Sequence, residues 1–139
     1  MPRFYLAPDS WDSAVLRGDE ARHLVQVLRI KPGQQVTVFD GRGRRADARV
    51  LTASREEVHL HLDEPQMTPS LWPAITLAVA IPKGKTMDTI VQKAVELGVA
   101  RIQPLLTEHT IVQPGDGKVE KWQRTALEAC KQCGQDCLP

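Results

Sequence analysis

In roughly the first 65 residues, apolar and polar side chains alternate in short runs, the pattern of β-strands with one buried face. The clearest runs are Gln35–Phe39, Ala46–Val50 and Val58–Leu62, in which every second residue is apolar. Arg3–Leu6 adds an earlier strand, and Asp40-Gly41-Arg42-Gly43 is a hairpin turn signal. Several short strands in one segment predict a small β-barrel or sandwich.

One short helix is expected among these strands. Asp19 is a suitable N-cap, and Leu24, Val25 and Leu28 share one helical face. Pro32-Gly33 then ends the helix and turns the chain.

Three prolines, Pro65, Pro69 and Pro73, separate this segment from the remainder of the chain. Prolines at such spacing are typical of a linker or domain boundary. We therefore predict two domains, residues 1–68 and 74–139.

After the prolines the hydrophobic pattern changes. Ile75–Ile81 is almost continuously apolar, as expected for a strand covered on both faces. An amphipathic helix around 87–95 ends at Gly98, and the strand Ile102–Leu106 follows. A turn at 114–117 precedes a second amphipathic helix. The apolar positions of the two helices are Met87, Ile90, Val91, Ala94, Val95, Val119, Trp122, Ala126, Ala129 and Cys133. The order β-α-β-α predicts a parallel sheet.

Composition and charge narrow the function. The chain is 42% hydrophobic and 25% charged, as in globular proteins, and its formal net charge is only +1. Positive charge is concentrated between Arg22 and Arg45, where six basic residues meet one acid, Asp40, giving a local charge of +5. Arginine suits phosphate because its guanidinium donates two parallel hydrogen bonds. This cluster therefore indicates nucleic-acid contact, and an ordinary solvated hairpin is the alternative.

Two short motifs imitate known sites. Lys83-Gly84-Lys85-Thr86 resembles the end of a phosphate-binding loop, but Val79 stands where that loop requires glycine. An NTPase is therefore not favoured, although the helix start and two lysines leave a phosphate-binding regulator as an alternative. Cys130, Cys133 and Cys137 lack the fourth ligand that most zinc or cluster sites need, so we predict buried or unreactive cysteines and no metal.

The start of the chain, its apolar runs and its cysteines bear on the cellular compartment of the protein. Its start has prolines and an early acid where a secretion signal needs an apolar run, and the longest apolar stretch is too short to span a bilayer. All three cysteines lie in the last ten residues, which does not suit a disulfide framework. We therefore predict a cytoplasmic protein with no membrane partner.

Taken together, the motifs resemble the bacterial small-subunit (16S) ribosomal RNA uracil-N3 methyltransferases, the RsmE type of the SPOUT superfamily. In the first half the matching motifs are Arg3-Phe4-Tyr5, His23-Leu24, Val27-Leu28-Arg29, Pro32-Gly33 and Phe39-Asp40-Gly41-Arg42-Gly43. In the second half they are Leu77-Ala78, Ile81-Pro82-Lys83-Gly84, Met87-Asp88, Gln92-Lys93-Ala94, Glu96-Leu97-Gly98-Val99, Pro104-Leu105, Thr107-Glu108, Trp122, Glu128-Ala129 and Gln132. The departures are His109 and Gln135, where the family usually has arginine.

The resemblance implies a fold of the β plus α/β class: a PUA-like β-barrel that binds RNA, then the first half of an α/β trefoil-knot methyltransferase domain. It implies transfer of a methyl group from S-adenosylmethionine to N3 of a uridine in 16S ribosomal RNA, with the small ribosomal subunit as partner and a homodimer when full length. The knot and the cofactor site are expected beyond Pro139, so the chain is expected to be a truncated form without activity of its own. A non-catalytic RNA-binding module is the alternative.

Candidate site residues follow from the predicted elements and from the basic cluster, together with the family resemblance. Lys83, Gln92 and Glu108 are polar residues at or near the ends of predicted elements, where open α/β sheets bind their ligands, and are the catalytic candidates. The RNA-binding candidates are Arg3, Arg22, His23, Arg29, Lys31, Arg42, Arg44 and Arg45.

Overall fold

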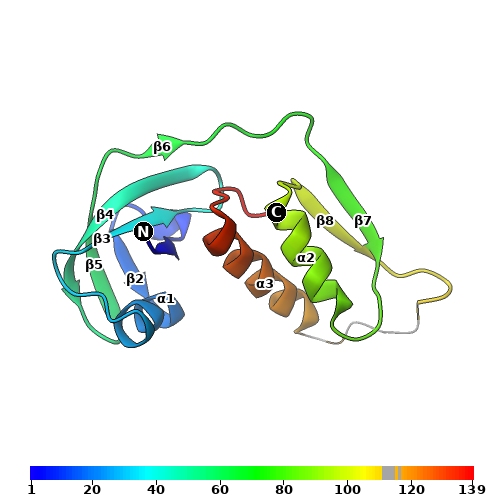
Figure 1. Cartoon of the computed structure of the whole chain (residues 1–139), viewed down its shortest axis with the longest axis horizontal. Coiled ribbons are helices and arrows are strands. Elements are labelled where there is room, and N and C mark those ends of the chain that lie inside the picture. The colour runs from blue at the N-terminus through cyan, green and yellow to red at the C-terminus, as the bar shows by residue number, and fades with distance from the viewer. Residues whose placement is uncertain (111–114, 116) are drawn as a thin grey trace. The chain divides into compact units, whose positions relative to one another are not determined.

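The computed structural model describes residues 1–110, 115 and 117–139. The chain forms two compact units, Met1–Pro69 and Ser70–Pro139 (Figure 1), and each is described by itself. No helix among the described residues is both long and apolar enough to cross a membrane.

The first unit is a curled six-stranded sheet (Figure 1). Its strands are β1 (Arg3–Tyr5), β2 (Val15–Arg17), β3 (Gln35–Phe39), β4 (Arg44–Ala53), β5 (Glu57–Leu62) and β6 (Gln66–Met67). The hydrogen-bonded order is β1-β3-β4-β5-β2, with β6 paired to β4. All pairs are antiparallel except β1 with β3. The predicted hairpin turn joins β3 to β4.

The core of this unit lies on one face of the sheet. Ala46, Ala48 and Val50 of β4 are buried, whereas Asp47 and Arg49 between them are exposed. The buried valines of β3 pack in the same cluster. The alternation read from the sequence is therefore confirmed for these strands, because one face of the sheet is dry and the other wet.

The predicted helix differs from the observed one. The 3₁₀ turn η1 (Pro8–Ser10) precedes β2. The helix α1 (Gly18–Arg22) begins directly after β2, so its N-cap is Arg17. The prediction of Asp19 as the N-cap was therefore wrong. The helix continues as a π-helical turn, η2 (His23–Val27). Leu24 is fully buried, but Leu28, the residue that follows the π-helical turn, is exposed.

The second unit has the predicted β-α-β-α order. Its elements are β7 (Thr76–Ala80), α2 (Thr86–Glu96), β8 (Arg101–Leu105) and α3 (Lys118–Cys133), and β7 and β8 are parallel. Gly98 follows the end of α2 with φ of 80°, a left-handed backbone that glycine adopts without strain. The turn predicted at 114–117 lies partly outside the described residues.

Two predictions of burial in this unit were wrong. The strand β7 is not covered on both faces: its residues alternate between exposed and half-buried, because α2 and α3 pack on one face of the sheet. In α3 the buried residues are Trp122, Ala126, Ala129 and Cys130, whereas Val119 and Cys133 are exposed. Cys130 is buried because the chain folds back after Gly134 and places the Cys137 carbonyl 3.6 Å from its sulfur.

Candidate nucleic-acid interface

The hairpin between β3 and β4 is held by a buried carboxylate. Asp40 is 5% exposed, and its Oδ1 accepts hydrogen bonds from the backbone N–H groups of Arg42 (2.7 Å) and Arg44 (3.1 Å). Its Oδ2 accepts a third from Arg44 Nε, at 3.1 Å. The Arg44 guanidinium lies 4.1 Å from the centre of the Trp11 ring. The hairpin is thereby tied to the segment before β2.

Arg44 is consequently not one of a row of equivalent surface arginines. Its side chain is 30% exposed and is engaged by both Asp40 and Trp11. Arg42 and Arg45, on either side of it, are exposed. Of these three RNA-binding candidates, Arg42 and Arg45 are therefore more exposed than Arg44.

Arg3 and Arg45 line an open groove of about 460 Å³ on the outer face of the sheet. The Arg3 guanidinium lies 4.8 Å from the Phe39 ring centre, and Arg45 donates a hydrogen bond to Gln66 Oε1 at 3.3 Å. Three acids line the same groove: Asp47, Asp63 and Glu64. The two positive and three negative charges give the lining a net charge of −1, so the cationic stretch of sequence does not become a uniformly cationic face.

The remaining basic candidates lie in other places. Arg29 and Lys31 line a groove of about 360 Å³ with apolar walls from Val25, Ile30 and other residues. Arg22 lies 3.5 Å from Asp19 on the exposed side of α1.

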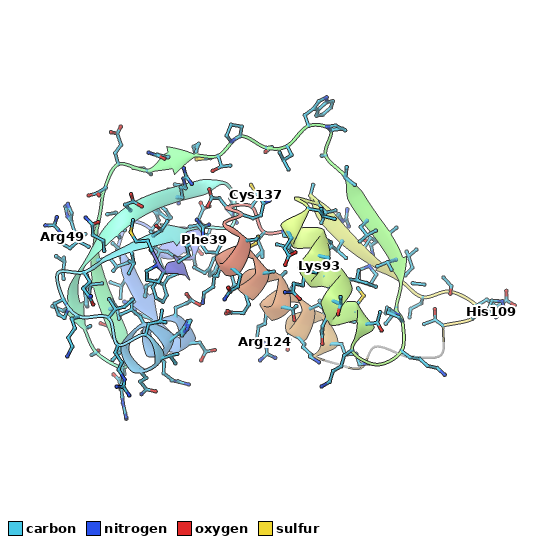
Figure 2. All side chains as sticks on the ribbon, in the orientation of Figure 1. Phe39, Arg49, Lys93, His109, Arg124 and Cys137 are labelled. Atoms are coloured by element: carbon cyan, nitrogen blue, oxygen red, sulfur yellow. The ribbon has the colours of Figure 1, made fainter. Side chains whose placement is uncertain are left out.

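His23 packs its ring edge-on against Phe4, with 6.0 Å between the ring centres. Arg49, on the outer face of β4, is also exposed, and Figure 2 shows its side chain projecting away from the sheet. Arg49 belongs with Arg42 and Arg45 as an accessible cation, and the alternation of β4 was the signal that placed it outside.

A further surface cluster joins β2 to β5. Arg17 Nε donates a hydrogen bond to Glu57 Oε1 at 3.2 Å, and His59 Nε2 lies 3.2 Å from Glu57 Oε2. These contacts lower the pKa of the Glu57 carboxyl below its ordinary value, and the hydrogen bond from Arg17 has the largest effect. Within the described residues no three His, Cys, Asp or Glu side chains gather as metal ligands.

In the second unit the structure separates Gln92 from the other two catalytic candidates. Lys83 and Glu108 each lie three residues beyond the end of a strand, at the carboxyl edge of the parallel β7–β8 pair, and both are exposed. Gln92 lies in the middle of α2, so its predicted position near an element end was wrong.

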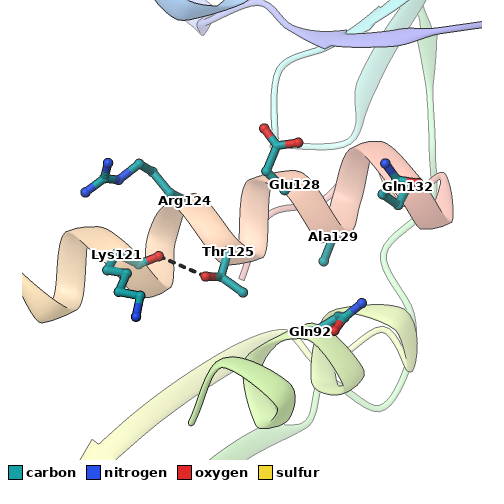
Figure 3. Close-up of a pocket in the computed structure, with 7 residues that line it drawn as sticks. All are labelled: Gln92, Lys121, Arg124, Thr125, Glu128, Ala129 and Gln132. Atoms are coloured by element: carbon teal, nitrogen blue, oxygen red, sulfur yellow. Dashed lines mark hydrogen bonds between the residues drawn. The ribbon is translucent and has the colours of Figure 1, made fainter. Parts of the chain in front are cut away.

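Gln92 instead lines an open groove of about 550 Å³ between α2 and α3 (Figure 3). Six residues of α3 complete the lining: Lys121, Arg124, Thr125, Glu128, Ala129 and Gln132. Lys121 and Arg124 were not singled out from the sequence. Residues three apart on a helix lie on the same side, so the sequence could have placed Lys121 and Arg124 together. It could not have shown that Gln92, from another helix, lines the same groove.

Comparison with known families agrees with this two-unit organisation. Residues 16–63 match the model of an RNA methyltransferase PUA domain, and residues 70–139 match that of an RNA methyltransferase domain. The chain belongs to the RNA methyltransferase family. The first match contains every basic candidate of the first unit except Arg3, and the second contains all three catalytic candidates.

Individual members of this family are similar over most of the chain. A Synechocystis protein named ribosomal RNA small subunit methyltransferase E is 34% identical over 99% of this chain and 46% of its own length. The protein of the same name from Bacillus subtilis is 27% identical over 89% of this chain and 50% of its own length. The chain therefore spans about half the length of the curated relatives it matches.

A solved structure supports the fold. The ribosomal RNA small subunit methyltransferase E of Neisseria gonorrhoeae, bound to S-adenosyl methionine, is 35% identical and superposes with a TM-score of 0.87. The match covers 100% of this chain and 60% of the Neisseria chain. The predicted fold class, a PUA-like β unit followed by an α/β methyltransferase unit, is confirmed, and so is the resemblance to RsmE-type methyltransferases.

Proposed function

We propose that this chain acts in the methylation of small-subunit ribosomal RNA, at N3 of a uridine, with S-adenosylmethionine as methyl donor. The observation that carries the proposal is the family match of both units in one chain, together with relatives named ribosomal RNA small subunit methyltransferase E. N3 of uracil carries a proton and faces the Watson–Crick partner. The base must therefore be unpaired or flipped out, and the proton must leave.

The two units divide this work. The first unit, predicted as residues 1–68, holds RNA phosphates through its exposed cations, of which Arg42, Arg45 and Arg49 lie on or beside one strand, β4. The second unit, predicted as residues 74–139, belongs to the site of methyl transfer. Lys83 and Glu108 remain candidates to contact the reacting base, because open α/β sheets bind ligands at the carboxyl ends of their strands.

The residues present do not fit S-adenosylmethionine by themselves. The apolar cavity bounded by α2, α3 and β8, which is lined by Met87, Val91 and Trp122 among others, measures about 140 Å³. Small-molecule sites typically measure about 300–1,000 Å³. The wider grooves described above are open to solvent. We therefore propose that the cofactor site needs residues outside those of this chain.

The partners follow from the same proposal. The RNA partner is 16S ribosomal RNA or the small ribosomal subunit in the cytoplasm, and the full-length protein is a homodimer. Support for the dimer comes from the family resemblance alone. Light scattering of the full-length protein at micromolar concentration tests it, and a monomer mass would contradict it.

Replacing Arg42 and Arg45 together with alanine is expected to weaken binding of a small-subunit ribosomal RNA fragment by about tenfold at about 0.15 M salt. The slope of log K against log salt should fall by about 2, because each lost phosphate contact releases roughly one counterion fewer. Stability should change by less than about 0.5 kcal/mol, since both side chains are exposed. Fluorescence anisotropy across a salt series measures both affinity and slope.

The matched control is Arg55→Ala, which removes an exposed arginine from the turn between β4 and β5. It should leave the salt slope nearly unchanged. An equal loss in both variants would show general electrostatics rather than a site at the hairpin. RNA binding that is retained by a full-length protein without methyl transfer would favour the alternative, a non-catalytic RNA-binding module.

A further inference from the structure

The groove between α2 and α3 has cationic side chains at one end and amide side chains at the other. Figure 3 shows Lys121 and Arg124 at one end, and Gln132 with Gln92 opposite it at the other, with the small side chain of Ala129 between them. Arg124 and Gln132 are eight residues apart, so about 12 Å of helix separates their backbones. This span suits a nucleotide whose phosphate lies at the cationic end and whose base lies at the amide end.

At each end of the groove at least one polar side chain is available to a ligand. Arg124 makes no ion pair, and the amides of Gln92 and Gln132 make no hydrogen bond, within the part of the chain that the structure describes. Lys121 forms an ion pair with Asp88, with 3.3 Å between Nζ and Oδ2. The Thr125 hydroxyl already donates a hydrogen bond within α3, to the backbone carbonyl of Lys121 at 3.0 Å.

The charges of the groove favour a single phosphate rather than a polyphosphate. Lys121 and Arg124 contribute two positive charges and Glu128 one negative charge, for a net charge of +1. Glu128 is itself engaged by Lys131, at 3.3 Å. Electrostatic attraction is therefore concentrated at the end that holds Lys121 and Arg124.

The two glutamines determine which base fits. A glutamine amide has a carbonyl acceptor and an NH₂ group with two donors. Using the carbonyl and one N–H, it pairs bidentately with the amino group of adenine and a neighbouring ring nitrogen. The adenine amino group has two hydrogens and a ring nitrogen on either side, so two facing glutamines can each bind one edge. Cytosine has a ring nitrogen on only one side of its amino group, and uracil has a single ring N–H for both glutamines. Guanine presents a carbonyl where adenine has the amino group.

We propose that this groove binds an unpaired adenine nucleotide of the RNA, outside the base that is methylated. The inference rests on the proposed function for the identity of the RNA. Gln92 and Gln132 read the base, and Arg124 and Lys121 hold its phosphate. The adenosine of S-adenosylmethionine is disfavoured in this groove, because its sulfonium would lie beside two cations.

The test is a titration of the 139-residue chain with adenosine 5′-monophosphate, followed by the side-chain amide signals of glutamines in NMR spectra. Binding with a dissociation constant on the order of 1 mM is expected. Gln92→Ala and Gln132→Ala should each weaken it by about 3–10-fold and remove the preference over the uridine, cytidine and guanosine monophosphates. Arg124→Ala should weaken all four nucleotides alike.

Gln123→Ala is the matched control, because Gln123 lies on α3 but lines the other cavity of this unit. It should leave the affinity unchanged. Inorganic phosphate that competes as well as the nucleotide, displacement by S-adenosylmethionine, equal affinity for all four bases, or no saturation would each overturn the proposal. The titration needs no cofactor and no methyl transfer, so a loss of methylation by the full-length protein with adenosine monophosphate binding intact would count against the proposed function alone.

Discussion

Replacing Asp40 with alanine is expected to destabilise the first unit by about 3 kcal/mol, a large fraction of the stability of a small domain. The carboxylate is 5% exposed and accepts three hydrogen bonds within the hairpin. Its removal leaves the N–H groups of Arg42 and Arg44 without their acceptor and the Arg44 guanidinium without its counter-charge. Urea unfolding monitored by tryptophan fluorescence measures the change.

Asp47→Ala is the control for this prediction. Asp47 lies on the same hairpin, but it is exposed, and its carboxylate accepts the Thr37 hydroxyl at 3.2 Å. The cost there should be within about 0.5 kcal/mol. A double-mutant cycle with Arg44→Ala should show strong coupling between Asp40 and Arg44, because they touch directly. Equal destabilisation by Asp40→Ala and Asp47→Ala would contradict the role given to Asp40.

A calorimetric titration of the 139-residue chain with S-adenosylmethionine is expected to show no saturable binding up to about 1 mM, a loss of at least about 100-fold against an ordinary micromolar site. The reason is size and enclosure: the apolar cavity of the second unit measures about 140 Å³, and the larger groove of this unit, about 550 Å³, is open to solvent. The Neisseria gonorrhoeae protein, whose structure is bound to S-adenosyl methionine, is the positive control.

Micromolar binding by the short chain would contradict this placement of the cofactor site. The residues around Lys83 and Glu108, at the carboxyl edge of β7 and β8, would then have to form a complete pocket by themselves. Replacing Lys83 with alanine in that chain would identify them.

The parts of the fold that could be predicted from the sequence are those set by local periodicity. The alternation at Ala46, Ala48 and Val50 predicts a strand because one side of the sheet excludes water, and burial confirms it. The period of α2 likewise predicts its buried face, on which the valines are almost fully covered. The π-helical turn His23–Val27 and the exposure of Leu28 after it do not follow from such a local period, which predicted one regular helical face.

The candidate sites were harder to predict because they depend on partners distant in sequence. In the run of basic residues, Arg44 looks the same as Arg42, and only the placement of the Trp11 ring and the Asp40 carboxylate distinguishes them. The acids of the groove beside Arg45 come from β4 and from the segment after β5. The groove between α2 and α3 likewise requires two helices to pack side by side.

The proposed reaction, methylation of uridine N3 in small-subunit ribosomal RNA, is tested most directly by identifying the methylated nucleoside. A chimaera in which this chain replaces the matching part of the Neisseria gonorrhoeae protein would be incubated with unmodified small-subunit RNA and labelled S-adenosylmethionine. Circular dichroism and cofactor binding would first establish that the chimaera is folded. Digestion to nucleosides and mass spectrometry should then find the label in 3-methyluridine. A folded, cofactor-binding chimaera that labels another nucleoside, or none, would contradict the proposed reaction.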